Sequence, residues 1–425
     1  MEEFHIIKYK LNNGLRLLIV PAQKQETVWV QICVGVGSCQ EKMGTRGIAH
    51  LTEHLVIENL LGRNTRRGQS DNIFKSFLRY YCYTYFDYTL YALEIPPRNA
   101  YTTLKNALSK FLSIEKFSQE DLSWAKNAIH REREQKIYQT VTGPLYEALY
   151  KVAYNRHPYR WYTIGQKRDY SALDLQEVFR FYRSFYIPNN IVVVVISSLS
   201  SSKIIHCVER GINKIKGGNL PRHNIPSELP QRRRRYRTFW DNVSTEHLLL
   251  GFKIPPLEHL YRTGLNVLNY ALFGRKAECK RLLTSPKGPV RYVFGYLPMT
   301  KFEGLYEILF VLRPGHSSKE VEEILFDNIK KYTVGKMSPD DLKRAKKRAI
   351  NEFDQIKITP KIFSSYLGIY ELLLKNYLIF LDYENSVKNL SRNSFLLSIA
   401  STMRKNHLTA ITVKPNQKEM ARIVS

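Results

Sequence analysis

Alternating apolar and polar residues at the start of the chain predict a β-hairpin. Residues 4–10 and 15–20 both have this strand pattern, and the segment 11–14 between them contains the Asn-Gly pair typical of tight turns. Residues 27–36 are rich in β-branched side chains and predict a third strand. Gly37-Ser38 follows and interrupts the strand pattern. The first 40 residues are therefore expected to form strands of one sheet.

Further along the chain the apolar residues recur with helical spacing. Residues 48–61, 99–114 and 118 to about 138 predict helices, while the Tyr-rich segment 79–94 alternates like one strand. Residues 191–196 form a continuous apolar run that is typical of a buried strand. The mixture of strands and helices predicts an α+β fold.

A repeated segment indicates that the chain has two related halves. The stretch from Ser338 to Glu352 matches the stretch from Ser118 to Glu132 at Ser, Asp, Leu, Ala, Lys and Glu, with a constant offset of 220 residues. The alternative is a chance likeness between two amphipathic helices with acidic N-termini. Residues 217–230 are rich in Gly, Pro, Asn and Ser, as linkers are.

These observations divide the chain into three predicted segments. Residues 1–215 form an N-terminal domain, 216–240 a basic linker and 241–425 a C-terminal domain. The length of 425 residues and the hydrophobic content of 44% suit two domains with substantial cores.

Cysteine usage and the N-terminus predict a soluble, cytoplasmic protein. The five cysteines include no C-x-x-C pair, which argues against a disulfide framework or a thiolate zinc site. The N-terminus lacks the basic and apolar regions of a signal peptide. The longest apolar run, 372–381, is interrupted by Lys375 and Asn376 and is expected to be a buried helix.

The net charge of +27 raises the question of an anionic partner. Arg232–Arg235 and Arg237 form the densest basic run. It is interpreted as a solvated linker, with a docking strip for an acidic partner or substrate as the alternative. The chain has no zinc-finger spacing, RNP-like motif or Gly-rich phosphate loop, so only charge favours nucleic acid, and no nucleic-acid partner is predicted.

The chemistry is predicted to lie in the predicted helix 48–61. His50 and His54 are four residues apart, so two imidazoles on one helix face can reach the same ion. Glu53 projects beside them and can take a proton from a water. Imidazole and carboxylate ligands suit Zn2+, which keeps one position open for water in catalytic sites.

Two histidines leave a third ligand to be found. Glu132 and Glu134 on the downstream helix are the natural candidates, and Asp87 and Glu58 are weaker ones. The competing interpretation is a solvated helix face that happens to carry two histidines.

The segments around this motif resemble the pitrilysin-type (M16) metallopeptidases, the inverzincin class. The matching segments occur in the family's order along the first 200 residues. They are Leu11-Asn-Asn-Gly-Leu-Arg16, Gly37-Ser38-x-x-Glu41, Gly47-Ile-Ala-His-Leu-Thr-Glu-His54, Tyr83-Thr84 with Asp87, Thr89 and Tyr91, Ala128-Ile-His-Arg-Glu132, His157-Pro158-Tyr159 with Gly165, and Tyr186-x-Pro-Asn-Asn190.

The resemblance implies a zinc endopeptidase. His50, His54 and Glu132 would be the metal ligands and Glu53 the general base. The implied fold has two homologous halves that face each other as a clamshell, with a peptide bound as an added strand inside a closed chamber. Tyr83, Thr84 and Tyr292 are the expected substrate contacts.

The chain also departs from the family pattern. Ala125 stands where a further glutamate is common, and Tyr81-Cys82 replaces the Asn-Ala of the substrate strand. Tyr292 has Ser285, not arginine, seven residues before it, and Arg281 is out of register.

The departures suggest either an unusual peptide substrate or a homologous partner subunit, in a heterodimer or homodimer. Small peptides or a precursor peptide are the expected substrates, including leader removal in bacteriocin maturation. A non-catalytic scaffold subunit is the alternative function.

Overall fold

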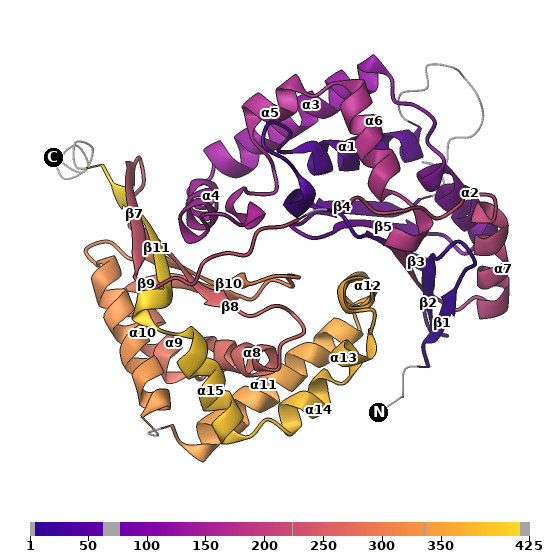
Figure 1. The fold of residues 1–425 in the computed structure, drawn as a ribbon. Helices are drawn as coiled ribbons and strands as arrows, with labels where there is room; N and C mark the ends of the chain where they lie inside the picture. Colours follow the sequence, from indigo (N-terminus) through magenta and orange to yellow (C-terminus); the bar gives the residue numbers. More distant parts are fainter. Residues whose placement is uncertain (1–4, 63–76, 223, 335–336, 417–425) are drawn as a thin grey trace. The chain divides into compact units, whose positions relative to one another are not determined.

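The computed structural model describes residues 5–62, 77–222, 224–334 and 337–416 (Figure 1). The chain forms two compact units. The first contains Met1–Arg133, Thr163–Ile225 and Ile356–Phe380, and the second contains Glu134–Tyr162, Pro226–Gln355 and Leu381–Ser425. Among the described residues, no helix has the length and apolar character needed to cross a bilayer.

A six-stranded sheet forms the centre of the first unit. Its strands lie in the order β1-β2-β6-β3-β5-β4, and only β2 and β6 are parallel neighbours. Their bounds are β1 Ile7–Lys10, β2 Arg16–Pro21, β3 Val28–Val34, β4 Arg79–Thr84, β5 Thr89–Ile95 and β6 Ile191–Ser197.

The predicted hairpin, third strand and buried strand are confirmed. Gly14 has a φ of 90°, which explains why glycine occupies the turn between β1 and β2. The segment 79–94 is not one strand, and this prediction is wrong. It forms the antiparallel pair β4 and β5, which reverses at Tyr85–Tyr88. The prediction failed because the aromatic alternation continues through the turn without glycine or proline.

Helices lie against both faces of this sheet (Figure 1). On one side α1 (Ile48–Leu61) contacts α2, α3 and α6 as well as β4 and β5. Their bounds are α2 Ala100–Leu112, α3 Gln119–Arg133 and α6 Leu175–Phe185, with α5 (Lys167–Ala172) beside α3 and α7 (Ser201–Ile212) beside α2. The predicted helices 48–61 and 99–114 are confirmed, and the third ends as the π-helical segment Glu134–Tyr138.

The other face of the sheet is covered by α12 (Pro360–Leu374), which packs on β3 and β6. Alternate residues of β3 point to it. The indole nitrogen of Trp29 donates to Ser364 Oγ at 2.9 Å, and Ser365 Oγ donates to Gln31 Oε1 at 2.9 Å. The helix therefore buries the second face of a strand whose seven residues are all buried.

One prediction about this region is wrong. Residues 372–381 are not one buried helix, because α12 ends at Leu374 and Lys375 has a φ of 57°. A short helix, α13 (Leu378–Leu381), follows, and Leu378 is 56% exposed.

A five-stranded sheet forms the centre of the second unit, in the order β7-β11-β8-β10-β9. β7 and β11 are parallel, and the other neighbours are antiparallel. The bounds are β7 Arg235–Asp241, β8 His247–Ile254, β9 Val290–Tyr296, β10 Gly304–Leu312 and β11 Leu408–Pro415. Apart from β1, this is the strand order of the first sheet, with its one parallel pair in the same place.

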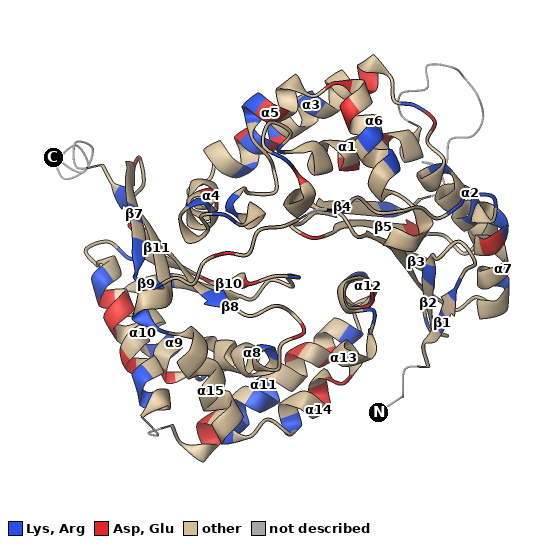
Figure 2. Cartoon of the chain, viewed as in Figure 1, with Lys and Arg blue, Asp and Glu red and all other residues tan. Residues whose placement is uncertain are grey.

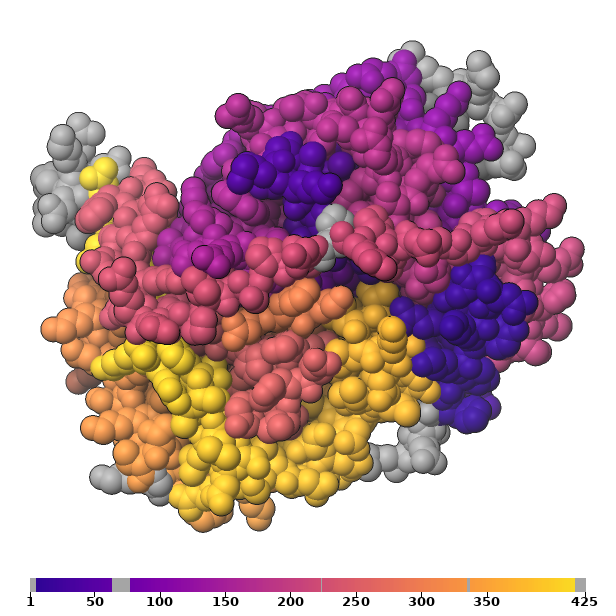
Figure 3. Space-filling view, in the orientation of Figure 1, coloured from indigo at the N-terminus to yellow at the C-terminus, as the bar shows by residue number. Residues whose placement is uncertain are grey.

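The helices of the second unit also repeat those of the first. α8 (Tyr261–Phe273) follows β8 as α1 follows β3, and α4 (Thr142–Ala153) packs on β7, β8 and β11. α14 and α15 contact α8, and the space-filling view shows yellow residues beside salmon-coloured ones in this part of the molecule (Figure 3). The remaining bounds are α9 Glu278–Thr284, α10 Ser318–Thr333, α11 Pro339–Lys357, α14 Tyr383–Lys388 and α15 Arg392–Thr402.

The sequence repeat lies at the start of two equivalent helices. Asp121 N donates to Ser118 Oγ at 3.0 Å before α3, and Asp341 N donates to Ser338 Oγ at 3.1 Å before α11. Both serines also donate their own N–H to the aspartate, so each helix begins with the same reciprocal cap. The α+β fold with two homologous halves is confirmed.

The two compact units differ from the predicted division at two segments. Residues 134–162, which carry α4, belong to the second unit, and residues 356–380, which carry α12, belong to the first. Each helix lies on the sheet of the unit to which it belongs. The predicted linker, 216–240, ends within β7, so Arg235 and Arg237 are residues of a strand.

Candidate metal centre

The start of α1 is held by the partly buried carboxylate of Glu41. Glu41 accepts hydrogen bonds from Gly47 N at 2.9 Å and Ala49 N at 3.0 Å, two donors that the helix itself leaves unpaired. Burial raises the pKa of Glu41 to about 8, although these hydrogen bonds oppose the shift. Gly47 has a φ of 103°, which few other residues adopt.

A loop from later in the first unit packs against this helix start. A Cβ on Gly165 would lie 2.3 Å from the Cα of Gly47, so only glycine fits there. Arg133, at the end of α3, donates to the carbonyl of Gly165 at 2.7 Å, and Arg46 pairs with Asp169. These contacts connect the start of α1 with the end of α3.

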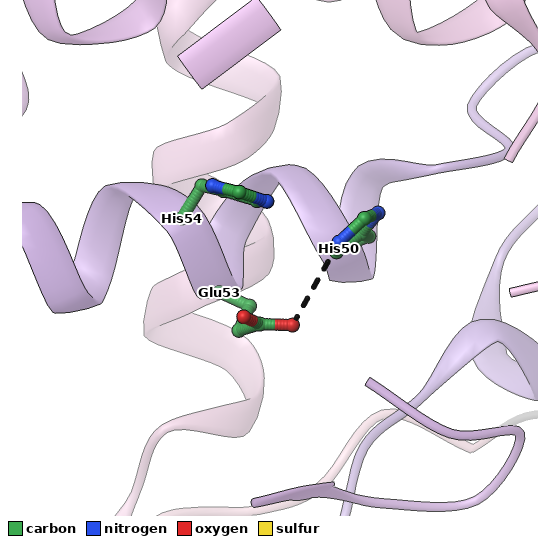
Figure 4. Close-up of side chains that lie close together, drawn as sticks. All are labelled: His50, Glu53 and His54. Carbon is green, nitrogen blue, oxygen red and sulfur yellow. Dashed lines mark ion pairs between the residues drawn. The ribbon is translucent and has the colours of Figure 1, made fainter. Parts of the chain in front are cut away.

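Three side chains of α1 lie close together (Figure 4). The candidate ligand atoms of His50, Glu53 and His54 all lie within 4.8 Å of one another. His50 Nε2 is 3.9 Å from Glu53 Oε2, and the two imidazole centroids are 4.8 Å apart. The first two residues are buried, and His54 is partly buried. The one-face arrangement expected from the spacing is what the helix produces.

The last turn of α3 brings Glu132 to the same place. Its Oε2 is 3.4 Å from Nε2 of His50 and 3.4 Å from Nε2 of His54. The side chain of Glu132 is only 22% exposed. One carboxylate oxygen thus faces two imidazole nitrogens that belong to a different helix.

These separations are those of a tetrahedral zinc site. Two donors that each lie about 2.05 Å from zinc stand about 3.4 Å apart at the tetrahedral angle. Within the described part of the chain, His54 Nε2 is buried and has no hydrogen-bond partner. A buried nitrogen without such a partner is costly unless an ion or a proton donor supplies the contact. The donor set therefore fits zinc.

Thr84 on β4 makes a contact that the sequence did not predict. Its hydroxyl donates to Glu53 Oε2 at 2.8 Å and so fixes one carboxylate oxygen. The neighbouring Tyr83 is 43% exposed, and Lys361 of α12 lies over the rings of Tyr81 and Tyr83. The Cys82 thiol has a raised pKa, mainly because it is buried and also because Glu53 and Glu58 are near.

The other predicted residues lie elsewhere. Glu134 begins the π-helical segment after α3, and Asp87 lies in the turn between β4 and β5. Glu58 is buried one turn beyond His54 on α1. Tyr292 is 51% exposed on β9 in the second unit.

Comparison with known proteins identifies the class. Residues 16–165 match the family model described as insulinase (peptidase family M16), and residues 172–349 match the model of the peptidase M16 inactive domain. The chain therefore belongs to the M16 peptidase family. The second match includes α8, which occupies the place of α1 without its histidines.

Relatives of this chain include named proteases. The zinc protease PqqE of Helicobacter pylori is 25% identical over 369 residues, which are 84% of this chain and 82% of that protein. A protease from Helicobacter pylori has the same fold, with a TM-score of 0.87, 22% identity and coverage of 97% of this chain and 100% of that one. The first half of the periplasmic protease PqqL from Escherichia coli matches with a TM-score of 0.78, 15% identity and coverage of 98% and 93%.

Proposed function

We propose that this chain is a zinc-dependent endopeptidase with His50, His54 and Glu132 as metal ligands and Glu53 as the general base. The observation that carries the proposal is the pair of 3.4 Å separations between Glu132 Oε2 and the two Nε2 atoms. The named zinc proteases among its relatives support the same reaction class.

A bound zinc ion would supply the Lewis acid that polarises the scissile carbonyl and lowers the pKa of water to near 7. Glu53 would take the proton of the attacking water and pass it to the leaving amine. Because Thr84 engages Oε2 of Glu53, we assign the proton transfer to Oε1.

We propose a peptide substrate that lies along β4. This strand is the outermost in the order of the first sheet, and a peptide can pair with an unoccupied sheet edge as an added strand. Exposed Tyr83 on β4 is a proposed side-chain contact, and Tyr292 would contribute in the closed chamber that the family fold implies.

The narrower assignments rest on sequence reasoning. Processing of one precursor peptide, including leader removal from a bacteriocin, is favoured by the altered substrate strand at Tyr81-Cys82. A homologous partner subunit would complete the substrate cleft. We propose a reducing, cytoplasmic location because all five cysteines are free thiols, although PqqL is periplasmic.

Metal analysis of matched variants tests the site. We expect close to one zinc per wild-type chain, the same content in Glu53→Gln, and zinc affinity lowered by more than about 100-fold in Glu132→Gln. Glu134→Gln is the matched control, because it lies two residues away and should keep the metal. Loss of zinc in Glu134→Gln but not in Glu132→Gln would reverse the assignment.

Peptide cleavage tests the reaction. Mass spectrometry of a mixed peptide pool should show products with the wild type and none with Glu53→Gln at equal zinc content. One dominant site would support precursor processing, and many sites would support general peptide breakdown. If Glu53→Gln cleaves as fast as the wild type, Glu53 is not the base.

A scaffold subunit is the alternative, and it rests on two observations. Tyr81 lies beneath the Lys361 ammonium group, and the Cys82 thiol beside it is held in a low-dielectric environment that raises its pKa. Both replace residues that grip the substrate in the family. A complex that keeps full peptidase activity with Glu53→Gln in this chain would favour the scaffold role.

A further inference from the structure

A cavity in the second unit has no role in the proposed reaction. It has a volume of about 360 Å³, within the range of small-molecule pockets. It lies where the C-terminal ends of α8 and α10 meet the first turns of α11, and the loop 274–277 closes one side. Every residue that lines it belongs to the second unit, whereas His50 and His54 belong to the first.

The inner wall of this cavity is apolar and partly aromatic. Tyr332 and Met337 line it and are 7% and 4% exposed, and Ala345 beside them is 3% exposed. The Tyr332 hydroxyl already donates to the carbonyl of Ala271 at 3.0 Å, so this donor is used within the protein. Because these three side chains are nearly covered, most of the aromatic surface open to a ligand belongs to Tyr270, which also lines the cavity and is partly exposed.

The rim of the cavity is strongly basic. Among the described residues, six cations and two carboxylates line it. The cations are Arg275, Lys276, Lys331, Arg344, Lys347 and Arg348, and the carboxylates are Glu278 and Asp341. Both carboxylates are already engaged, Glu278 with Lys331 at 2.7 Å and Asp341 with Arg344. Figure 2 shows basic residues in blue on α11.

Three of these cations have no counter-charge. Within the described ranges, the side chains of Arg275, Lys276 and Lys347 form no ion pair or hydrogen bond, and all three are exposed. Exposed like charges around one opening repel each other and raise the local positive potential, which a multivalent anion would relieve. Arginine and lysine are also the side chains that bind phosphate groups most strongly.

We propose that this cavity binds an organic polyphosphate of the nucleoside triphosphate class. The flat apolar part of the ligand packs against Tyr270 and the exposed edges of Tyr332 and Met337 inside the cavity. The phosphate chain lies at the rim and is neutralised by Arg275, Lys276 and Lys347. The proposal depends on neither the zinc site nor the peptidase reaction.

Calorimetric titration with magnesium-free ATP at physiological ionic strength tests the site. We expect one ATP per chain, and affinity for inorganic triphosphate or for adenosine that is lower by at least about 10-fold. ATP and triphosphate bound with equal affinity would show that the apolar wall contributes nothing. Several weak ATP molecules per chain, lost as salt rises, would show ordinary attraction to a basic surface. Either outcome overturns the proposal.

Charge-reversal variants test whether ATP binds in this cavity. Lys276→Glu and Lys347→Glu should each lower ATP affinity by about 10-fold or more. Lys343→Glu is the matched control, because it changes the charge by the same amount. Lys343 is exposed on α11, as Lys347 is, but does not line the cavity. All three residues are exposed, so the thermal midpoint should be unchanged. An equal loss of affinity in Lys343→Glu would refute the assignment to this cavity.

Discussion

Gly368, in the middle of α12, faces the first sheet at a point with no room for a side chain. A Cβ at this position would lie 2.3 Å from Cys33 Sγ and 3.4 Å from Val194 Cγ2. Cys33 is fully buried on β3, so its sulfur cannot move into solvent. Gly368→Ala is therefore expected to destabilise the protein, although the same change in most helices is stabilising.

The magnitude follows from two opposing effects. Replacing glycine by alanine inside a helix contributes about 1 kcal/mol of stabilisation. Inserting a methyl group into a packed interior costs about 1–3 kcal/mol, and the 2.3 Å approach places this site at the upper end. The expected net loss in the free energy of unfolding is about 1–2 kcal/mol, or about 3–6 °C in the midpoint for a unit of roughly 200 residues.

Denaturant unfolding monitored by tryptophan fluorescence measures this loss, because the indole of Trp29 is hydrogen-bonded to Ser364 in α12. Cys33→Ala removes the sulfur and supplies the matched background. In that background the destabilisation caused by Gly368→Ala should be smaller by at least about 1 kcal/mol, because residues in contact have coupled effects on stability. If Gly368→Ala is as stable as the wild type, the packing of α12 on β3 described above is wrong.

Three further variants test separate contacts. Thr84→Val should lower kcat/KM for peptide cleavage by about 10-fold without loss of zinc, because Glu53 loses a hydrogen bond, and Thr84→Ser should restore the rate. Burial raises the pKa of Glu307, which accepts from Tyr150, from 4.5 to about 7. Between pH 4.5 and about 7, Glu307 stays protonated in the folded state but is ionised in the unfolded state. The free energy of unfolding therefore falls by up to about 3 kcal/mol as the pH rises through this range. Glu307→Gln should flatten this fall in unfolding measured from pH 4 to 8, and an unchanged slope would contradict it. Glu41→Ala should lower the thermal stability by about 1–2 kcal/mol, because two N–H groups at the start of α1 lose their acceptor. An unchanged midpoint would show that water replaces that acceptor.

Local signals explain the parts of the fold that the sequence predicted. The turn at Gly14 needs a positive φ, and α1 begins directly after Gly47, so both lie where short-range sterics decide the backbone. The 79–94 segment resembles one strand because neither glycine nor proline separates β4 from β5, and Asp87 alone marks the turn. The reversal is stabilised instead by a distant contact, in which Ser38 N and Cys39 N donate to the carbonyls of Tyr85 and Phe86.

The residues of the candidate site also differ in whether a local sequence pattern predicts them. His50, Glu53 and His54 follow from helical spacing alone. Glu132 required the resemblance to a family, since spacing along the chain does not show that α3 ends beside α1. Thr84 was expected to contact the substrate, which stays a prediction. Its hydrogen bond to Glu53 was not predicted, because it depends on how β4 packs against α1.

The position of α12 could not be predicted from local patterns. Its partner strand, β3, lies more than 300 residues earlier, and the fit depends on single atoms such as Cys33 Sγ opposite Gly368. The contacts of the basic run could not be predicted from local patterns either. Arg235 donates to the carbonyls of Val152 and Ala153 at the end of α4, so this residue, expected in a solvated linker, caps a helix.

The place of α12 in the first unit has a consequence for synthesis on the ribosome. All six strands of the first sheet have been made once residue 197 is complete, but the helix that covers one face of β3 and β6 ends at Leu374. During translation of the intervening residues, Trp29, Gln31 and Cys33 would face water or a chaperone. The nascent chain therefore carries an exposed sheet face while residues 198–374 are being made. Ribosome-bound chains arrested before residue 360 should be more sensitive to proteolysis than chains arrested after α12 has emerged.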